Sequence, residues 1–522
     1  MPDCYNSDMP RYAAVDIGSN SVRMMAAEVN QGETRIRAQD RQVTRLGESV
    51  FRSGRIAKEA LDFLCANLQR MAVTCSRLDV LALRAVATSA VRDASNREEF
   101  LQRTGAALGT NVEVISGPEE ARLIHLGVEA RWPRPKERTL IIDVGGGSAE
   151  LIISHGGQLV DAVSKPLGAV RLTEMFLQND PARAEELDRL ANYIDEKLIS
   201  FHKVHGGEKF DRAVATSATA AAVVSAVNRI PRPKREEADR MRASISQVRE
   251  LYLLLARSDL STRRKLTGIG PKRAEIITAG TMVFLRILEL FAHRSIYYCA
   301  AGVRDGIIAD LGARGVGREL SQLSRDQRRT VEAMAKRYGV SLKHARHVAC
   351  LAHRLFEILQ PVHQLTPPAG KILEAAAYLH DMGHFVSGTG HHKHSAYLVA
   401  NSDMPGFTDK ERFTIAALCR FHRKSMPQAR HSYFQALDSD SRRTVLRLTP
   451  LLRIADALDR GHEQRVRNLE GAVKDGNVNV LIRADTDAGL ELWAANKAAD
   501  ACLQAYAQPI ILQRARTVKS SQ

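Results

Sequence analysis

The sequence predicts an α/β protein built from two related halves, followed by an all-helical domain and a small β-containing segment at the C-terminus. One short pattern, an Asp between two apolar residues followed by Gly-x-x-Ser, occurs twice, at residues 15–21 and 142–148. Strand-like and helix-like segments alternate from residue 11 to about residue 312, which is typical of α/β proteins. Helical periodicity then dominates until about residue 462, and strand-like alternation returns from Val466.

Composition shifts indicate where the domains meet. A polar, proline-containing patch at residues 132–138 is typical of a linker, and a Gly- and Arg-rich stretch at residues 312–318 precedes the helical region. We expect strands at Val478–Ile482 and Gly489–Trp493 in the last segment. In the first half, the expected strands and helices lie at Tyr12–Ala14, Val22–Val29, Ile56–Ala72, Val80–Ala87 and Val112–Ser116. The expected domains are residues 1–135, 136–312, 313–465 and 466–522.

Composition also limits the class of protein. Hydrophobic residues make up 44% and charged residues 26%, which is ordinary for a globular protein. The seven cysteines are scattered and form no C-x-x-C pair, so we expect a reducing, cytoplasmic environment, with peripheral membrane association left open. The apolar stretch 276–292 is interrupted by Arg286 and Glu289, so it predicts a buried helix and not a membrane span. The net charge of +16 favours a polyanionic partner, although aromatic residues at 5% are too few for an obvious base-stacking platform.

The repeated pattern is the candidate site. An apolar strand that ends in Asp143 runs directly into Gly145, Gly146, Gly147 and Ser148. Glycines allow positive φ and leave amide N–H groups uncovered, and successive uncovered amides bind anions. An Asp beside such a turn suits Mg²⁺, which prefers oxygen ligands. The other interpretation of a single copy is an ordinary tight hairpin, but two matched copies favour duplicated halves that face each other across a cleft.

A helix start at residues 116–122 offers a further acid. Ser116 and Glu119 have the spacing of a capping box, and Pro118 fits the first helical turn. Acids in a first turn often do no more than complement the helix dipole. The capping box accounts for Glu119 only, which leaves Glu120 as a candidate for chemistry.

These residues resemble the exopolyphosphatase/guanosine pentaphosphate phosphohydrolase (Ppx/GppA) family, within the acetate kinase–sugar kinase–actin superfamily. The helical part is similar to the longer members, which carry an HD-type domain, notably at His394–Tyr397 and Asn401–Phe407. The resemblance implies two actin-like, ribonuclease H-like domains and, commonly, a homodimer. The pieces that carry it are Ala13–Ser21, Ala87–Asn96, Ile115–Gly127, Ile141–Glu150 and Gly302–Gly306.

The resemblance implies a role for each site residue. Glu120 would be the catalytic base, and Asp143 and Glu150 would hold Mg²⁺, with Asp16 as a further candidate ligand. The third turn departs from many relatives, because Ala215 and Ala218 stand where those have glycine. The residues implied to bind phosphate are Ser19, Asn20, Ser21, Arg92, Gly145, Gly146, Gly147, Ser148, Ser217 and Thr219.

The helical region carries a second candidate site. His344, His380, Asp381 and Asp456 follow the H…HD…D order of HD-type phosphohydrolases. Imidazole and carboxylate ligands together suit Mn²⁺, Fe²⁺ or Zn²⁺. Further candidate ligands are His391, His394 and His422. The alternative is a vestigial site that binds no metal, in which these side chains only hydrogen-bond one another.

The leading functional prediction is an Mg²⁺-dependent exopolyphosphatase that releases orthophosphate from the end of inorganic polyphosphate. Guanosine pentaphosphate is the alternative substrate for the same chemistry. A sugar or acetate kinase is less favoured, because no glycine-rich adenosine loop is recognisable. An alternative of another class is an alarmone or nucleic-acid sensor that binds through the HD-type domain. No nucleophilic Ser-His-Asp or Cys-His set is evident, so direct attack by water is the simpler mechanism.

Overall fold

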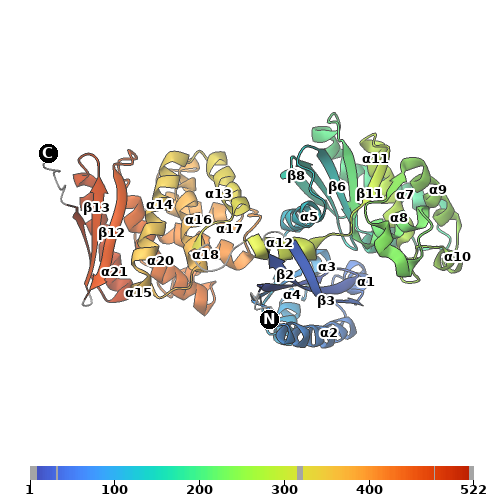
Figure 1. Cartoon of the computed structure of the whole chain (residues 1–522), viewed down its shortest axis with the longest axis horizontal. Coiled ribbons are helices and arrows are strands. Elements are labelled where there is room, and N and C mark those ends of the chain that lie inside the picture. Colours follow the sequence, from blue (N-terminus) through green and yellow to red (C-terminus); the bar gives the residue numbers. More distant parts are fainter. Residues whose placement is uncertain (1–8, 31–32, 314–320, 475–476, 516–522) are drawn as a thin grey trace, which may run out of the picture. The chain divides into compact units, whose positions relative to one another are not determined.

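The computed structural model describes residues 9–30, 33–313, 321–474 and 477–515 (Figure 1). The chain divides into two compact units, residues 1–313 and residues 314–522. The finer division into four domains stays a prediction. No helix among the described residues is both long enough and apolar enough to cross a bilayer.

The first half of the N-terminal unit is a five-stranded sheet in the order β3-β2-β1-β4-β5. Its strands β1, β2 and β3 form an antiparallel meander, and β1, β4 and β5 run parallel. The strands are β1 (Arg11–Ile17), β2 (Ser21–Asn30), β3 (Glu33–Val43), β4 (Ala82–Ala87) and β5 (Val112–Val114). The helices are α1 (Leu46–Ser53), α2 (Lys58–Arg77), α3 (Ser89–Asp93), α4 (Arg97–Leu108) and α5 (Gly117–Arg131).

The second half is a six-stranded sheet in the order β10-β11-β9-β6-β7-β8. Its strands are β6 (Arg138–Val144), β7 (Ala149–His155), β8 (Gln158–Lys165), β9 (Arg212–Thr216), β10 (Arg242–Ser244) and β11 (Ser295–Tyr298). Its helices are α6 (Ala169–Phe176), α7 (Ala184–His205), α8 (Ser217–Val227), η1 (Arg232–Ala238), α9 (Ile245–Arg257), α10 (Leu260–Lys265), α11 (Ile277–Leu290) and α12 (Val303–Ala313). Helix α11 confirms the buried helix predicted at residues 276–292.

The two sheets share one topology, which confirms the duplicated halves. An antiparallel meander, β3-β2-β1 or β8-β7-β6, is continued by two parallel strands, β4-β5 or β9-β11. The repeated pattern lies at the same place in both copies, where β1 turns into β2 and β6 turns into β7. The centre of strand β6 is apolar on both faces, since Leu140, Ile141 and Ile142 are consecutive and all fully buried.

The C-terminal unit is helical from residue 321 to residue 465 in its described part, and then closes with a small sheet. The helices are α13 (Arg325–Arg337), α14 (Leu342–Ile358), α15 (Gln360–His363), α16 (Pro368–Leu379), η3 (Met382–Phe385), α17 (His391–Ala400), α18 (Asp409–Phe421), α19 (Ser432–Gln435) and α20 (Ser439–Ala457). The sheet, in the order β12-β13-β14, comprises β12 (Val466–Lys474), β13 (Asn477–Ala484) and β14 (Ile510–Arg514), with α21 (Gly489–Tyr506) crossing between the parallel β13 and β14.

The strand expected at Gly489–Trp493 is wrong, because this segment is the first turn of α21. Ala495, Ala499 and Cys502 form the buried side of that helix, which packs on α20. A five-residue alternation cannot distinguish a strand from a helix with exposed apolar side chains, and Leu490 and Trp493 are such side chains. The strand predicted at Val478–Ile482 is confirmed within β13.

Candidate functional site

The two repeated turns lie against each other in the N-terminal unit. Each is closed by the same bond, from the Gly18 amide to the Ser21 carbonyl at 3.1 Å and from the Gly145 amide to the Ser148 carbonyl at 3.0 Å. A Cβ atom on Gly147 would lie 2.6 Å from the Ser19 hydroxyl, so only glycine allows this approach. Positive φ is not the reason, contrary to the sequence-based expectation, because Gly147 and its glycine neighbours are not among the positive-φ residues.

The turns leave backbone amides open while their carbonyls are used. The carbonyls of Gly145 and Gly146 accept bonds of 2.9 Å from the first amides of α6. Within the described part of the chain, the amides of Asn20, Gly146 and Gly147 have no protein acceptor. Uncovered amides on neighbouring turns make a concavity that suits phosphate oxygens.

The serines of the two turns are buried and largely structural. The Ser19 hydroxyl accepts a bond of 3.2 Å from the Ala90 amide, at the start of α3. Ser21 and Ser148 are buried, and the Ser148 hydroxyl bonds the Glu150 carboxylate. Their contact with phosphate stays a prediction, and the open backbone amides of the turns are the groups that are free to make it.

Four carboxylates gather beside these turns. Asp143 and Glu150 face each other as cross-strand partners in β6 and β7. Burial raises the pKa of Asp143 to about 7, and the charges of Glu120 and Asp16 add to the rise. Burial, Glu120 and Asp143 together raise the pKa of Glu150 well above its usual range. Burial raises the pKa of Asp16 against the effect of the nearby Arg23.

This arrangement fits a divalent cation. Buried carboxylates that repel one another are stabilised when a hard cation takes their oxygens as ligands. The Ser164 hydroxyl donates to Glu150 Oε1 at 2.8 Å and orients that carboxylate. The donor set is oxygen only, which suits Mg²⁺, so Asp143 and Glu150 remain the proposed ligands.

Glu120 lies in the first turn of α5, and Arg92 holds it in place. Arg92 Nη1 donates to Glu120 Oε2 at 2.9 Å and to the Ile115 carbonyl at 2.7 Å. Burial raises the pKa of Glu120, against the lowering effect of Arg92. Arg92 was expected to hold phosphate, but the structure places its guanidinium on the candidate base. Arg92 can therefore position the candidate base, and its contact with phosphate stays a prediction.

The predicted capping box at the same helix is only half formed. The Ser116 hydroxyl accepts a bond of 3.3 Å from the Glu119 amide, as expected. The Glu119 carboxylate instead pairs with Arg122 at 2.8 Å and Arg84 at 3.1 Å. These two arginines also pair with Asp310 of α12, so Glu119 belongs to a buried ionic network beneath the site.

The third turn, between β9 and α8, is built differently from the other two. Ser217 adopts φ of 90°, which is rare for a residue other than glycine, and its hydroxyl accepts from the Thr219 amide at 3.2 Å. The buried Thr219 hydroxyl donates to the Val144 carbonyl at 2.8 Å. Arg273 reaches the same hydroxyl at 3.4 Å. Thr219 therefore supports the end of β6, and its contact with phosphate stays a prediction.

Sequence reasoning missed a cluster of arginines that adjoins the carboxylates. Its members come from β2, β3, η1, the segment before α11 and α12, and they repel one another. Burial, reinforced by neighbouring arginines, lowers the pKa of Arg273 to about 9. Arg23 and Arg304 lie close enough to Asp16 to lower its pKa. We call this set the arginine cluster: Arg23, Arg41, Arg232, Arg235, Arg273 and Arg304.

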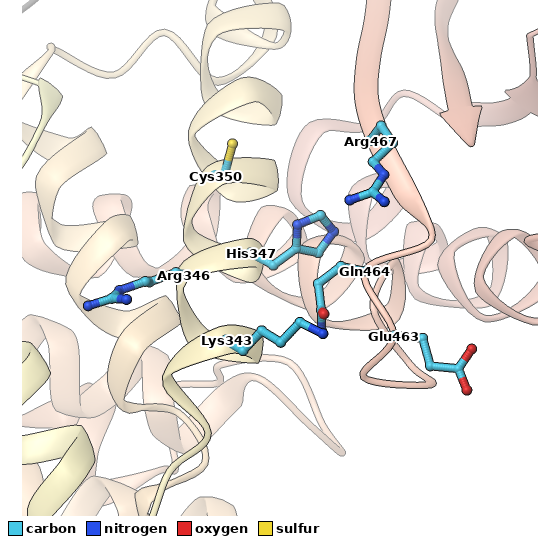
Figure 2. A pocket seen from close by; sticks show the side chains of 7 residues that line it. All are labelled: Lys343, Arg346, His347, Cys350, Glu463, Gln464 and Arg467. Atoms are coloured by element: carbon cyan, nitrogen blue, oxygen red, sulfur yellow. The ribbon is translucent and has the colours of Figure 1, made fainter. Parts of the chain in front are cut away.

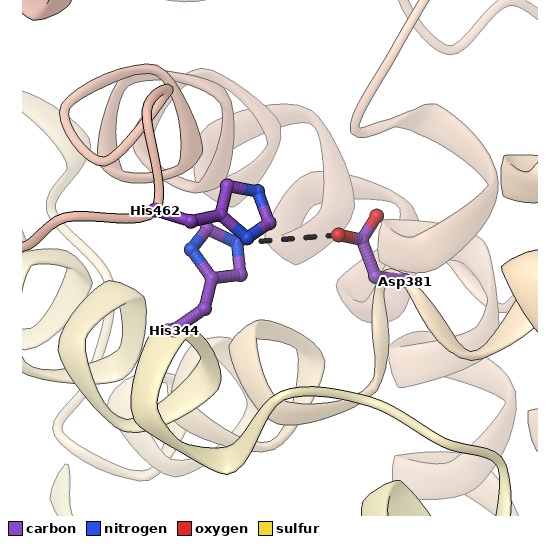
Figure 3. Close-up of side chains that lie close together, drawn as sticks. All are labelled: His344, Asp381 and His462. Carbon is purple, nitrogen blue, oxygen red and sulfur yellow. Dashed lines mark ion pairs between the residues drawn. The ribbon is translucent and has the colours of Figure 1, made fainter.

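In the C-terminal unit, the predicted His344, His380, Asp381 and Asp456 come together. The Nε2 atoms of His380 and His344 lie 3.5 and 3.7 Å from Asp456 Oδ1. Figure 3 shows His344 and Asp381 facing each other at 4.0 Å, with His462 stacked on the His344 ring. Without a metal ion, burial opposes the charged imidazole of His380, but the negative charges of Asp381 and Asp456 outweigh it and raise the pKa of His380 to about 9, so this point favours a cation.

The sequence is similar to two family models and to a curated relative over most of its length. The model of the Ppx/GppA phosphatase family matches residues 25–314, and that of Ppx/GppA phosphatase domain III matches residues 327–490. A guanosine-5'-triphosphate,3'-diphosphate pyrophosphatase of Vibrio vulnificus (strain YJ016) is 27% identical over 445 residues, which cover 85% of this chain and 86% of that protein.

Solved structures agree with the fold of the N-terminal unit. A crystal structure of an exopolyphosphatase-like protein is 29% identical with a TM-score of 0.57, covering 59% of this chain and 99% of its own. An exopolyphosphatase from Cytophaga hutchinsonii is 25% identical with a TM-score of 0.55, covering 58% of this chain and 97% of its own. The sheets thus have the actin-like arrangement of these proteins. The chain belongs to the Ppx/GppA phosphatase family and is a hydrolase that acts on phosphoanhydride bonds.

Proposed function

We propose that the N-terminal unit removes the terminal phosphate of inorganic polyphosphate as orthophosphate. The observation that carries this substrate is the arginine cluster. Among the described residues, none of its six guanidinium groups has a carboxylate oxygen within 4.0 Å, although each is positively charged. A chain of phosphates would provide a counter-charge for each arginine in turn, whereas a single phosphate would reach only a few.

Each group of residues in the site has a separate role in hydrolysis. The chemistry that Mg²⁺ supplies when bound by Asp143 and Glu150 is neutralisation of charge on the terminal phosphate. The open amides of the two turns hold oxygens of that phosphate. Glu120 accepts the proton of the attacking water while Arg92 keeps its carboxylate oriented. Positioning and charge stabilisation are the main requirements of phosphoryl transfer, and these groups meet both.

Guanosine pentaphosphate is a second candidate substrate. It is favoured by the named Vibrio vulnificus relative, whose similarity runs through 85% of this chain and therefore includes most of the C-terminal unit. Its 5'-triphosphate and 3'-diphosphate would also provide counter-charges for the arginine cluster. The base has no evident stacking partner in the sequence, which has few aromatic residues.

A side-by-side assay distinguishes these substrates. Orthophosphate release is measured with long-chain polyphosphate, guanosine pentaphosphate and ATP, at several salt concentrations. We expect the highest kcat/KM with polyphosphate and the steepest loss of affinity with salt, because long polyanions release the most counterions. A higher kcat/KM for guanosine pentaphosphate would assign the second substrate instead, and no release from any of them would reject the proposal.

Two variants of one strand test the arginine cluster. Arg41 and Arg35 both lie on β3, but Arg35 lies outside the cluster and is well exposed. Arg41→Ala should raise the KM for polyphosphate roughly tenfold, since a charged contact is worth about 1.5–3 kcal/mol. Arg35→Ala should leave the KM unchanged. Equal effects of both variants would mean that only net charge matters.

A further inference from the structure

Asp381 lies between two groups of histidines, and each of its oxygens faces one group. On the first side, Oδ2 lies 3.6 Å from His380 Nε2 and 4.0 Å from His344 Nε2. Asp456 Oδ1 approaches the same two nitrogens. Two imidazole nitrogens and two carboxylate oxygens thus converge on one point, which is the donor set of a transition-metal ion.

The two histidines of the first side are oriented for coordination. His344 Nδ1 bonds Asp459 Oδ2 at 2.8 Å, and His380 Nδ1 bonds the Ala377 carbonyl at 2.9 Å. These bonds place the ring hydrogen on Nδ1 and turn the Nε2 lone pair inward. Both rings are buried, yet neither Nε2 atom has a hydrogen-bond partner among the described residues. A buried polar atom without a partner is costly, and a metal ion would satisfy both.

The second side repeats this arrangement with other residues. Asp381 Oδ1 lies 3.5 Å from His391 Nε2, 3.6 Å from His384 Nε2 and 3.9 Å from His422 Nε2. His391 and His422 are buried, whereas His384 is half exposed and stacks on the His391 ring. The predicted ligand His394, on the same helix as His391, is not among the described residues that gather around Asp381.

The contact between His391 and His422 points to a second ion. His391 Nδ1 faces the Gly388 carbonyl at 3.3 Å, and His422 Nδ1 faces the Cys419 carbonyl at 2.8 Å. With these tautomers, two Nε2 lone pairs meet 3.2 Å apart. Such a pair repels without a cation, but about 3.0–3.4 Å is the spacing of two nitrogens on one metal ion with bonds of about 2.1 Å.

A basic pocket adjoins the first side. Its volume is about 390 Å³, and Figure 2 shows Lys343, His347 and Arg467 around it together with the acidic Glu463. Arg346 also lines it, but Arg346 and Arg467 pair with Glu332 and Asp485, so Lys343 is the lining cation without an acidic partner among the described residues. Gln464 also lines it, and its side chain donates at 3.1 Å to the same Asp459 oxygen that meets His344. The pocket and the histidines are therefore joined through one loop, and the charge of the pocket suits a phosphate group.

We propose that the C-terminal unit holds two divalent transition-metal ions bridged by Asp381, and that the adjoining pocket takes a phosphate-bearing ligand. One ion is held by His344, His380 and Asp456, and the other by His391 and His422, with His384 beside them. The centre is separate from the N-terminal site, so it stands whether or not polyphosphate is the substrate there.

Metal content of the full-length protein tests the bridge. The variants are made in an Asp143→Asn parent, because the N-terminal carboxylates would otherwise hold a further Mn²⁺. After loading this parent with Mn²⁺ and dialysis, we expect two Mn²⁺ per chain and an exchange-coupled electron paramagnetic resonance signal. His422→Ala should retain one ion and give a single-ion spectrum, whereas the neighbouring His394→Ala should keep both. Asp381→Ala should lose both, with circular dichroism as the check on folding. A single ion in the Asp143→Asn parent, or two ions after His422→Ala is added to it, would overturn the bridge.

The pocket is tested with inorganic phosphate on the Mn²⁺-loaded protein. Phosphate should change the exchange-coupled signal of the wild type and should do so at roughly tenfold higher concentration in Lys343→Ala, which removes an exposed cation of the pocket. The signal arises only from paired ions, so phosphate bound in the N-terminal unit does not contribute. No change with phosphate in the wild type would reject the ligand assignment.

Discussion

Replacing Asp143 with Asn should stabilise the metal-free protein at alkaline pH while it weakens Mg²⁺ binding. Asp143 is 9% exposed, and burial together with Glu120 and Asp16 raises its pKa from 3.8 to about 7. A carboxyl group whose folded pKa is raised stabilises the fold at pH values below its unfolded pKa, and this contribution is lost as the pH rises through the folded pKa. The wild type should therefore weaken between about pH 4 and pH 8, and an amide at this position should not.

The size of the effect follows from the pKa. A rise of about three units corresponds to roughly 4 kcal/mol at 1.36 kcal/mol per unit, of which about two units, or roughly 3 kcal/mol, fall between pH 5 and pH 7. The unit of residues 1–313 should shift by about 1.5 °C per kcal/mol, since its unfolding entropy is about 2.1 cal/mol/K per residue, so the melting temperature of Asp143→Asn minus that of the wild type should grow by roughly 4–5 °C over this range. The amide introduced at position 143 carries no charge, so at alkaline pH the variant also loses the repulsion between this position and the carboxylates of Glu120 and Glu150.

Calorimetry of the full chain in chelator, at intervals from pH 5 to pH 8, measures this difference. Asp188→Asn, at an exposed position of α7, is the matched control and should show no pH-dependent difference. Mg²⁺ added at pH 8 should raise the melting temperature of the wild type far more than that of Asp143→Asn, because a ligand stabilises in proportion to its occupancy. A difference that stays constant with pH, or an equal response to Mg²⁺, would refute the assignment of Asp143.

Three further outcomes test the site. Glu120→Gln should lower kcat by roughly 10²–10⁴ with little change in KM, as initial rates would show, and near-normal turnover would remove its role as base. Arg92→Ala should lower kcat and move the acidic limb of the pH–rate profile upward, because Arg92 lowers the pKa of Glu120; an unmoved profile with a raised KM would return Arg92 to phosphate binding. Gly147→Ala should cost about 1–3 kcal/mol in urea unfolding, since its Cβ would lie 2.6 Å from the hydroxyls of Ser19 and Ser89, and wild-type stability would contradict the close packing of the turns.

The duplicated halves could be predicted from the sequence because their central hairpins combine buried strands with a repeated turn. Strand β6 is apolar on both faces, and β1 and β2 are nearly so. Strand β3 was missed because residues Glu33–Val43 are mostly exposed and polar, and only pairing with β2 makes them a strand. The strand expected at Gly489–Trp493 failed for the opposite reason, since tertiary packing on α20 selects a helix.

The candidate site was only partly predictable, and the difference lies in how far apart its parts are in sequence. Asp143 and Glu150 frame one turn, so a local pattern indicates that they meet. The arginine cluster comes from five separate segments, and each arginine alone resembles a solvated surface charge. The same limit applies to Arg92, whose partner Glu120 is brought near only when β4 and β5 pair. Contacts between residues far apart in sequence depend on the topology of the fold, and a local sequence pattern carries no information about that topology.

The two copies of the hairpin, residues 15–23 and 142–150, differ in charge at one position, and this difference explains how a duplicated fold makes an asymmetric site. In both copies the Asp before the turn faces the second residue after the conserved Ser on the neighbouring strand. That partner is Arg23 opposite Asp16 in the first copy and Glu150 opposite Asp143 in the second. The first pair is neutral as a whole and continues into the arginine cluster, whereas the second is doubly acidic and requires a cation. This change of charge places the arginine cluster beside the first turn and the proposed metal ligands beside the second, while the open amides of both turns remain free to meet the same phosphate.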